Sequence, residues 1–205
     1  FAENRWWLVD PDGHPFWSTG LDCVRPVIDS AYTGIEKALA WLPPAEGLYA
    51  AAYRPGYWAN RSVDFLVANL ARTFGEDWFA RWSEIVPALM RTWGFNTVAN
   101  WSDWQMASRA GLPYTRPLNE HMPRSQKIYR SFPDVYHPNF EADAADYAEQ
   151  LRETRDDPAF LGYFLLNEPD WGFASLTLAE GMLFNTLQCA SRQALADFLK
   201  GRYSD

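Results

Sequence analysis

One run of residues constrains the fold of this chain more than any other. Every residue from Phe160 to Leu166 is apolar, aromatic or Gly, the pattern of a strand buried on both faces of a parallel sheet. Asn167, Glu168 and Pro169 follow at once, and a proline ends a strand because it has no N–H to donate. We therefore expect Asn167 and Glu168 at the carboxyl end of a buried strand, the edge at which α/β folds bind ligands.

Glu168 is a candidate general acid. A carboxyl group at this edge, set against apolar walls and beside an amide that can hold a hydroxyl, suits a proton donor whose pKa is raised by desolvation. The alternative is a strand that ends in an ordinary polar turn. The Asn-Glu pair alone does not decide between the two interpretations.

The rest of the chain alternates between predicted strands and predicted helices. Strands are expected at 19–26, 95–99, 114–118 and 160–166, and helices at 63–73, 78–93, 106–110, 139–151 and 187–200. In the second helix an apolar stripe that includes Trp78, Trp82 and Trp93 is expected to face the core, and Pro87 to kink or shorten it. Asn139 is placed to cap the fourth helix.

This βα alternation implies a parallel sheet with right-handed crossovers. Four units are half of the eight that close a barrel. The predicted fold class is therefore α/β, a (β/α)8 TIM barrel of which residues 1–205 form the amino-terminal half, with the other half expected from the same chain. An open four-stranded sheet, or a half-barrel that dimerises to hide its edges, are the alternatives.

Two segments lie outside the alternation. Residues 1–18 are predicted to form a leading β-hairpin around the turn Asp10-Pro11-Asp12-Gly13. Residues 29–61 are predicted to be an irregular insertion rich in aromatic side chains. The insertion could form a wall of a binding cleft, or it could pack as an ordinary subdomain.

Composition excludes several classes of partner. The formal net charge of −8 argues against nucleic acid and anionic membranes, and no apolar run approaches the length of a membrane span. Cys23 and Cys189 are expected to be small buried residues, and the three histidines lack metal-ligand spacing, so we predict no metal and no cofactor. Aromatic residues make up 17% of the chain, which favours carbohydrate binding because ring faces stack on sugar C–H faces.

The order of several segments resembles the clan A retaining glycoside hydrolases, most closely their agarase and β-galactosidase-like branch. The segments are Trp7-Leu8-Val9-Asp10-Pro11-Asp12-Gly13-His14-Pro15-Phe16, Trp93-Gly94-Phe95-Asn96-Thr97-Val98, Asn100-Trp101-Ser102-Asp103, Phe132-Pro133-Asp134-Val135, Asp157-Pro158, Gly162-Tyr163-Phe164 and Asn167-Glu168-Pro169. They span most of the chain. The resemblance implies hydrolysis of β-glycosidic bonds in a galactose-containing polysaccharide or oligosaccharide, and an extracellular or periplasmic location.

The resemblance also implies roles for single residues. Glu168 matches the acid/base at the end of the fourth strand, and Asn167 the amide that holds the 2-hydroxyl of the sugar. The family takes its nucleophile from a seventh strand that this sequence lacks, so the chain alone is expected to be inactive. Asp22, Asp103 and Asp170 could substitute for that nucleophile, but each better suits a hydroxyl binder, a cap or a turn.

Four further residues are candidate sugar contacts. They stand at predicted strand ends or after the Asn-Glu-Pro motif, and they are Asp22, Asn100, Trp101 and Trp171. Core packing competes with ligand binding for the last three. A protein that binds carbohydrate in an aromatic cleft without cleaving it is the alternative function.

Overall fold

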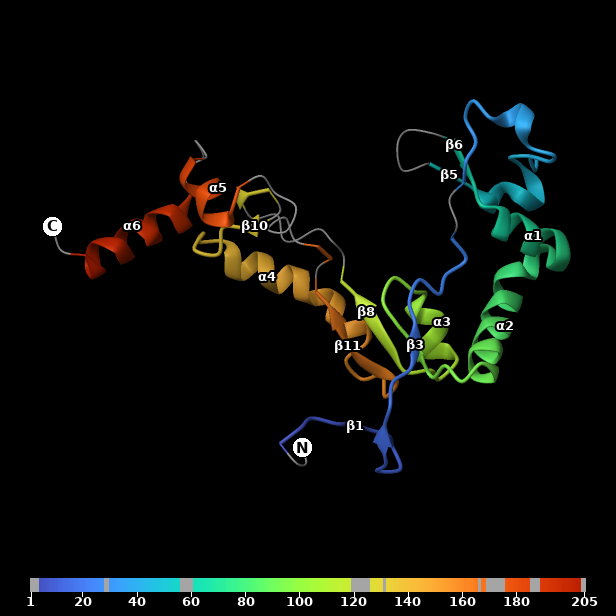
Figure 1. Cartoon of the computed structure of the whole chain (residues 1–205), viewed down its shortest axis with the longest axis horizontal. Helices are drawn as coiled ribbons and strands as arrows, with labels where there is room; N and C mark the ends of the chain where they lie inside the picture. Colours follow the sequence, from blue (N-terminus) through green and yellow to red (C-terminus); the bar gives the residue numbers. More distant parts are fainter. Residues whose placement is uncertain are drawn as a thin grey trace. The chain divides into compact units, whose positions relative to one another are not determined.

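The computed structural model describes residues 4–27, 30–55, 61–118, 126–130, 132–165, 167–168, 176–184 and 189–203. The chain divides into two compact units, Phe1–Arg116 and Pro117–Asp205. Figure 1 colours the first unit from blue to yellow-green and the second from yellow to red. None of the helices in the described part combines the length and the apolar character needed to span a membrane.

Three parallel strands form the sheet of the first unit. They are β3 (Gly20–Leu21), β7 (Thr97–Val98) and β8 (Tyr114–Pro117), and they lie side by side in chain order. Leu21 is opposite Val98, which is in turn opposite Tyr114. Gly20 is required at its position because a Cβ atom there would lie 2.7 Å from the carbonyl oxygen of Thr97. The parallel pairing expected of successive βα units is thus present for three strands, although β3 and β7 are shorter than predicted, and the four-unit barrel remains a prediction.

The helices of the first unit begin and end close to their predicted positions. They are α1 (Phe65–Phe74), α2 (Trp78–Thr92) and α3 (Trp104–Arg109). The Asp64 carboxylate accepts the Val67 N–H at 3.0 Å and so caps α1, and Gly75 follows the helix with φ of 67°. Pro87 does not shorten α2, which continues to Thr92.

One prediction for α2 is wrong. Trp82 and Met90 are buried as the apolar stripe requires, but Trp93 is 62% exposed. Trp93 is the residue after the last helical turn, where its N–H still bonds to the carbonyl oxygens of Leu89 and Met90. Two further apolar residues on the expected inner face, Ile85 and Leu89, are each 40% exposed within the helix. The described residues therefore cover the stripe only in part.

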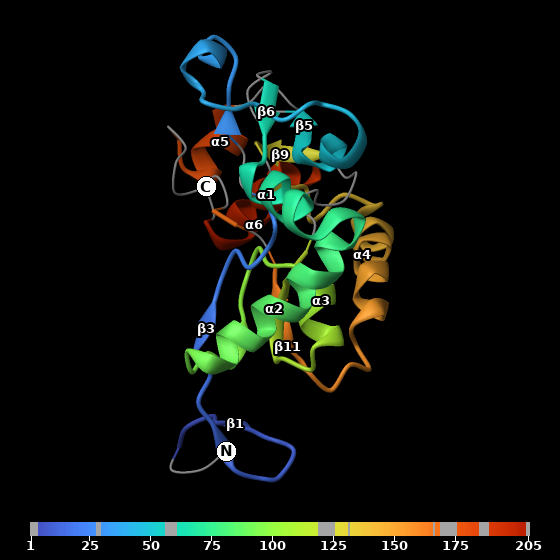
Figure 2. The ribbon, with the colours of Figure 1, turned by 90° about the vertical axis from the view of Figure 1, so that its right-hand side faces the viewer.

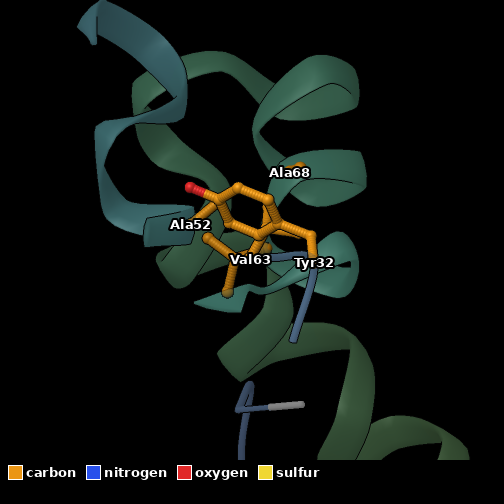
Figure 3. Close-up of a cluster of buried hydrophobic side chains, with 5 residues drawn as sticks. Tyr32, Ala52, Val63 and Ala68 are labelled. Carbon is orange, nitrogen blue, oxygen red and sulfur yellow. The ribbon is translucent and has the colours of Figure 1, made fainter. Parts of the chain in front are cut away.

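The aromatic insertion is a packed subdomain. Its elements are β4 (Ser30–Ala31), η1 (Glu36–Ala38), η2 (Gly47–Ala52), β5 (Tyr53–Pro55) and β6 (Arg61–Val63), with the strands antiparallel in the order β4-β6-β5. Tyr32, Ala52, Val63 and Ala68 meet in its core (Figure 3), and Tyr49 and Tyr53 pack against them. The described part of the stretch is therefore less irregular than the sequence indicates, and Tyr32, Tyr49 and Tyr53 in it serve packing. Tyr57 and Trp58 lie outside the described residues.

The predicted hairpin precedes the sheet. Strands β1 (Leu8–Val9) and β2 (Pro15–Phe16) are antiparallel, with Leu8 opposite Phe16. Asp10 closes the turn, because its Oδ1 accepts the N–H groups of Asp12 and His14 at 3.0 and 2.8 Å. Figure 2 shows the hairpin beyond the amino end of β3, on the side opposite to the carboxyl end of that strand.

The described residues of the second unit form a hairpin, four helical segments and a five-residue strand. They are β9 (Lys127–Tyr129), β10 (Phe132–Pro133), α4 (Phe140–Ala148), η4 (Glu149–Glu153), β11 (Phe160–Phe164), α5 (Leu178–Phe184) and α6 (Ala190–Arg202). Asn139 does not cap α4 through its side chain. Its φ and ψ of −90° and −2° are already helical, whereas a capping side chain needs an extended backbone to reach the first turn.

β11 is less buried than predicted. Its first four residues are half-buried, and Phe164 is exposed. Tyr163 is held at one face, where its hydroxyl donates to the carbonyl oxygen of Leu151 at 3.1 Å and lies 2.9 Å from the Thr154 Oγ1. A strand is buried on both faces only where a layer of helices covers each face, and the described residues of this unit cover those of β11 in part.

A buried carboxylate holds the beginning of α6. Asp134 is fully buried, and its Oδ2 accepts the Ala190 N–H at 2.6 Å. Its Oδ1 accepts the Ser191 N–H at 2.8 Å and the Ser191 hydroxyl at 2.6 Å. Asp134 thus caps a helix that begins 56 residues later in the sequence.

Candidate active site at the strand ends

Three strands end in the same unusual backbone conformation. Cys23 after β3, Trp101 after β7 and Glu168 after β11 have φ of 54°, 56° and 44°. Side chains other than glycine rarely adopt this left-handed region, and such strained residues concentrate at functional sites. The predicted catalytic residue and one predicted sugar contact are therefore at points where the backbone stores strain.

Hydrogen bonds join the carboxyl ends of β3 and β7 in the first unit. The Cys23 N–H donates to the Asn100 carbonyl oxygen at 2.9 Å, and the Val24 N–H donates to the Ser102 Oγ at 2.9 Å. The Asp103 N–H returns a bond to the Val24 carbonyl oxygen at 2.9 Å. These contacts fix the backbones of the two loops against each other.

Asn100 is the most informative side chain at this edge. It is 7% exposed, and neither its Oδ1 nor its Nδ2 has a hydrogen-bond partner among the described residues. Leaving a buried polar atom unsatisfied costs about 1–3 kcal/mol, so such an atom usually has a reason to be there. The Nδ2 of this amide needs an acceptor and its Oδ1 needs a donor. A hydroxyl group can serve as either partner.

The other predicted residues of this edge differ in their surroundings. Asp22 is exposed directly after β3, and Trp101 is half-buried after β7. Asp103 is a helix cap, since its Oδ1 accepts the Met106 N–H at 2.8 Å at the start of α3. Cys23 is exposed rather than buried as predicted, because the turn at its positive φ directs the chain out of the sheet.

In the second unit Asn167 and Glu168 follow β11, at the carboxyl end where the sequence places them. The Leu118 N–H donates to the carbonyl oxygen of Phe164 at 3.0 Å, and the Tyr147 hydroxyl of α4 donates to that of Leu165 at 3.3 Å. Burial raises the pKa of Tyr147, which keeps its hydroxyl protonated as a donor. These contacts hold the backbone that leads into the candidate acid/base.

The surroundings of Glu168 differ from the prediction. Asn167 is half-buried, but Glu168 is exposed rather than set against apolar walls among the described residues. A strand end acquires such walls only from segments that pack over it. Trp171 and the rival carboxylate Asp170 lie outside the described residues.

The hairpin turn brings together three groups that could bind a cation. One ligand atom from each of Asp10, Asp12 and His14 lies within 4.8 Å of the others. The Oδ1 of Asp10, however, already accepts two backbone N–H groups as part of the turn. The cluster is therefore explained by the turn, and it does not change the expectation that no metal is needed.

The unsatisfied amide of Asn100 leads to a stability prediction. Replacing Asn100 by Leu should leave the free energy of unfolding unchanged or raise it by about 1 kcal/mol, because two unpaired polar atoms are removed at similar volume. Replacing Ser102 by Ala is the matched control at the same edge, and the loss of the acceptor for the Val24 N–H should cost about 1 kcal/mol. Urea unfolding of both variants measures the difference, and a clear loss of stability in Asn100→Leu would show that the amide is satisfied.

Comparison with known proteins places the chain near one group of enzymes. No protein-family profile matches it. It is 28% identical to β-agarase A of Vibrio sp. (strain JT0107) over an alignment of 204 positions, which covers 88% of this chain and 20% of that protein. It is 24% identical to β-agarase B of the same organism over an alignment of 243 positions, gaps included, which covers 98% of this chain and 25% of that protein. The chain thus spans a fifth to a quarter of these relatives.

Solved structures agree with this similarity. The chain matches the structure of PfGH50B with a TM-score of 0.80 at 24% identity, over 98% of this chain and 34% of that one. It matches an exo-β-agarase with a TM-score of 0.75 at 22% identity, over 98% and 36%. The agarase AgWH50C gives 0.74 at 25% identity, over 96% and 33%. The fold of these 205 residues is therefore that of about a third of an agarase chain.

Proposed function

We propose that the protein is a glycoside hydrolase that cleaves β-glycosidic bonds of a galactose-containing polysaccharide of the agar type. The supporting observation is a similarity to β-agarases that extends over 88% and 98% of the chain. Within that similarity, Glu168 follows the carboxyl end of β11, the edge at which α/β folds bind their ligands.

We propose a retaining double displacement with Glu168 as the acid/base. In this mechanism the protonated carboxyl group gives its proton to the oxygen of the leaving sugar while a second carboxylate attacks the anomeric carbon. The same group then removes a proton from the water that hydrolyses the glycosyl-enzyme. The exposed position of Glu168 on a left-handed turn leaves its carboxyl group accessible to a glycosidic oxygen.

The second carboxylate has no good candidate among the described residues. Retention requires it about 5–5.5 Å from the acid/base. Asp103 is engaged as the cap of α3, and no contact holds Asp22 in a defined orientation among those described. We propose that the nucleophile belongs to a further part of the protein, in keeping with relatives four to five times as long as the matched region.

We propose sugar contacts in each of the two units by itself. Asn167 is half-buried beside Glu168 and is assigned to the 2-hydroxyl of the sugar that is cleaved. Asn100 is assigned to a second hydroxyl because its buried amide lacks both a donor and an acceptor among the described residues. Trp101 and Trp171 are assigned to stacking on sugar rings, and Asp22 to an exposed hydroxyl.

The proposal is tested by comparing the 205-residue chain with the full-length gene product. The full-length protein should hydrolyse agarose and release a product whose first-formed anomer is β, which proton NMR detects before mutarotation. The isolated chain should show no turnover of agarose or of aryl β-galactosides, because one carboxylate cannot perform both steps. Turnover by the isolated chain would refute the missing nucleophile, and a full-length protein inactive on every galactan would refute the assigned substrate.

A further inference from the structure

The leading hairpin carries an unusual concentration of exposed aromatic surface. Trp6 is 85% exposed, Trp17 is 80% exposed and Trp7 is 45% exposed. Burying a large apolar side chain stabilises a fold, so leaving several of them in water forgoes considerable stabilisation. Exposed apolar side chains that gather in one place, rather than being scattered singly, mark a binding surface.

These side chains line a cavity of about 370 Å³ that is open to solvent. Its lining includes Arg5, Trp6, Trp7, Phe16, Trp17 and Ser18. A volume of roughly 300–1,000 Å³ with mostly aromatic walls and a few polar groups is typical of small-ligand sites. Here the polar groups are a guanidinium and a hydroxyl, which between them offer hydrogen-bond donors and an acceptor.

The register of the hairpin explains how the cavity forms. Leu8 and Phe16 are opposite one another, so one residue further from the turn each strand carries a tryptophan, Trp7 and Trp17. The turn itself is closed by the bonds to Asp10, and the far end is tied to the sheet by the Asn96 Nδ2, which donates to the Trp17 carbonyl oxygen at 2.9 Å. These bonds fix the backbone that carries the tryptophans before a ligand arrives, which lowers the entropic cost of binding.

The hairpin is separate from the candidate active site. Asn96 and Thr97 hold it at the amino ends of β3 and β7, through the bond to Trp17 and a 2.8 Å contact between the hydroxyls of Ser18 and Thr97. Asn100, Trp101 and Asp22 are at the carboxyl ends of the same two strands. Five residues separate Trp17 from Cys23, and a chain that advances six positions spans about 20 Å where it is extended.

We infer that this hairpin cavity is a second carbohydrate site, which binds a neutral polysaccharide chain away from the place of cleavage. Tryptophan faces stack on the C–H faces of pyranose rings, and Arg5 and Ser18 supply hydrogen bonds to the ring hydroxyls. The net charge of −8, and Asp10 and Asp12 in the adjoining turn, oppose an anionic polymer and also a second copy of this chain. That the polysaccharide is a galactan rests on the proposed function; the site itself does not.

The test is affinity electrophoresis of the 205-residue chain in native gels that contain soluble low-gelling agarose. Wild type should be retarded, and the double variant Trp6→Ala/Trp17→Ala should lose at least tenfold in affinity. Trp93→Ala is the matched control, since Trp93 is a 62% exposed tryptophan of the same unit outside the hairpin, and it should bind as wild type does. Trp6→Tyr/Trp17→Tyr keeps the ring faces and should retain most of the affinity, which guards against loss of folding.

The possible results separate this site from the proposed substrate. Equal retardation of wild type and the Ala double variant overturns the hairpin site and leaves the proposed function standing. Retardation by another neutral polysaccharide such as dextran, lost in the same variant, supports the site and contradicts the galactan assignment. Absence of retardation by any polysaccharide overturns the site. The site is also overturned if sedimentation shows that wild type self-associates and that Trp6→Ala/Trp17→Ala does not.

Discussion

Replacing Glu168 by Gln in the full-length protein is expected to lower kcat on agarose by about 10²–10⁴-fold, the usual contribution of a positioned general acid. Glutamine keeps the size and shape of the side chain but cannot transfer a proton. The leaving group of a polysaccharide is a sugar alkoxide, which departs very slowly unless it is protonated. Initial rates of reducing-end formation, compared with wild type, measure the loss.

Two measurements separate proton transfer from a structural role. An aryl β-galactoside with an acidic phenol releases a phenolate that needs little protonation. The rate at which the variant forms the glycosyl-enzyme should therefore fall far less with this substrate than with agarose. Azide can attack a glycosyl-enzyme without help from a base, and it should restore turnover in Glu168→Ala with a β-glycosyl azide as product. An α-azide would contradict retention.

The matched control is Glu149→Gln. Glu149 is an exposed carboxylate of the same unit that pairs with Arg152, and such a surface pair contributes little to stability. It should hydrolyse agarose at the rate of wild type. Both variants should still bind agarose. If Glu168→Gln hydrolyses agarose at the rate of wild type, Glu168 is not the acid/base, and a function in which Glu168 takes no part becomes the better interpretation.

Replacing Asp134 by Ala is expected to lower the free energy of unfolding of the second unit by about 3 kcal/mol, because it leaves a buried helix start without its charged acceptor. The Ala190 N–H, the Ser191 N–H and the Ser191 hydroxyl all donate to this carboxylate. Hydrogen exchange of the α6 amides should accelerate about a hundredfold, which corresponds to that free energy.

Asp134→Asn should recover only part of this loss. An amide has one acceptor oxygen, so its NH₂ group must face either the Ala190 N–H or the donors of Ser191, and two donors cannot bond to each other. Asp156→Asn is the matched control. Asp156 is an exposed carboxylate that contacts Arg155, and its loss should change α6 exchange little. A similar acceleration in both variants would contradict the role of Asp134.

The same residue predicts a dependence on pH. Burial raises the pKa of Asp134, but the hydrogen bonds from Ser191, Ala190 and Tyr136 together lower the pKa by more than burial raises it. The pKa is therefore below its ordinary value of 3.8. A carboxyl group whose folded pKa is depressed stabilises the fold fully above its unfolded pKa, and this stabilisation is lost as the pH falls through the folded pKa. Wild type should therefore lose more stability than Asp134→Asn as the pH is lowered below about 4.

Local sequence signals predicted the helices well. Asp64 and Gly75 bound α1 within two residues of the prediction, and Gly94 follows α2 as expected. Caps and glycines act on backbone groups three or four residues away, so the sequence alone contains all the partners that are involved. The hairpin at Asp10–Gly13 was predictable for the same reason, since the turn is closed by its own residues.

Contacts between distant residues had no such signal. Asp134 caps a helix that begins 56 residues away, and the Asn100 carbonyl oxygen accepts the Cys23 N–H across two strands. The exposure of Trp93 and the half-burial of β11 depend on which segments cover them, which periodicity does not specify. The aromatic insertion is a comparable case, because its rings could line a cleft or pack a core until Tyr32, Val63 and Ala68 are seen together.

The candidate site also has a part that the local sequence predicts and a part that only the tertiary structure shows. The sequence by itself determined that a carboxyl group, Glu168, follows a strand, because an apolar run that ends in Asn-Glu-Pro leaves little choice of position. Only the tertiary structure decided that Glu168, Trp101 and Cys23 share a left-handed backbone, and that the Asn100 amide is buried without a described partner. The reason is physical: chain direction is set by neighbouring residues, whereas strain and unsatisfied polar groups persist only where packing from distant segments sustains them.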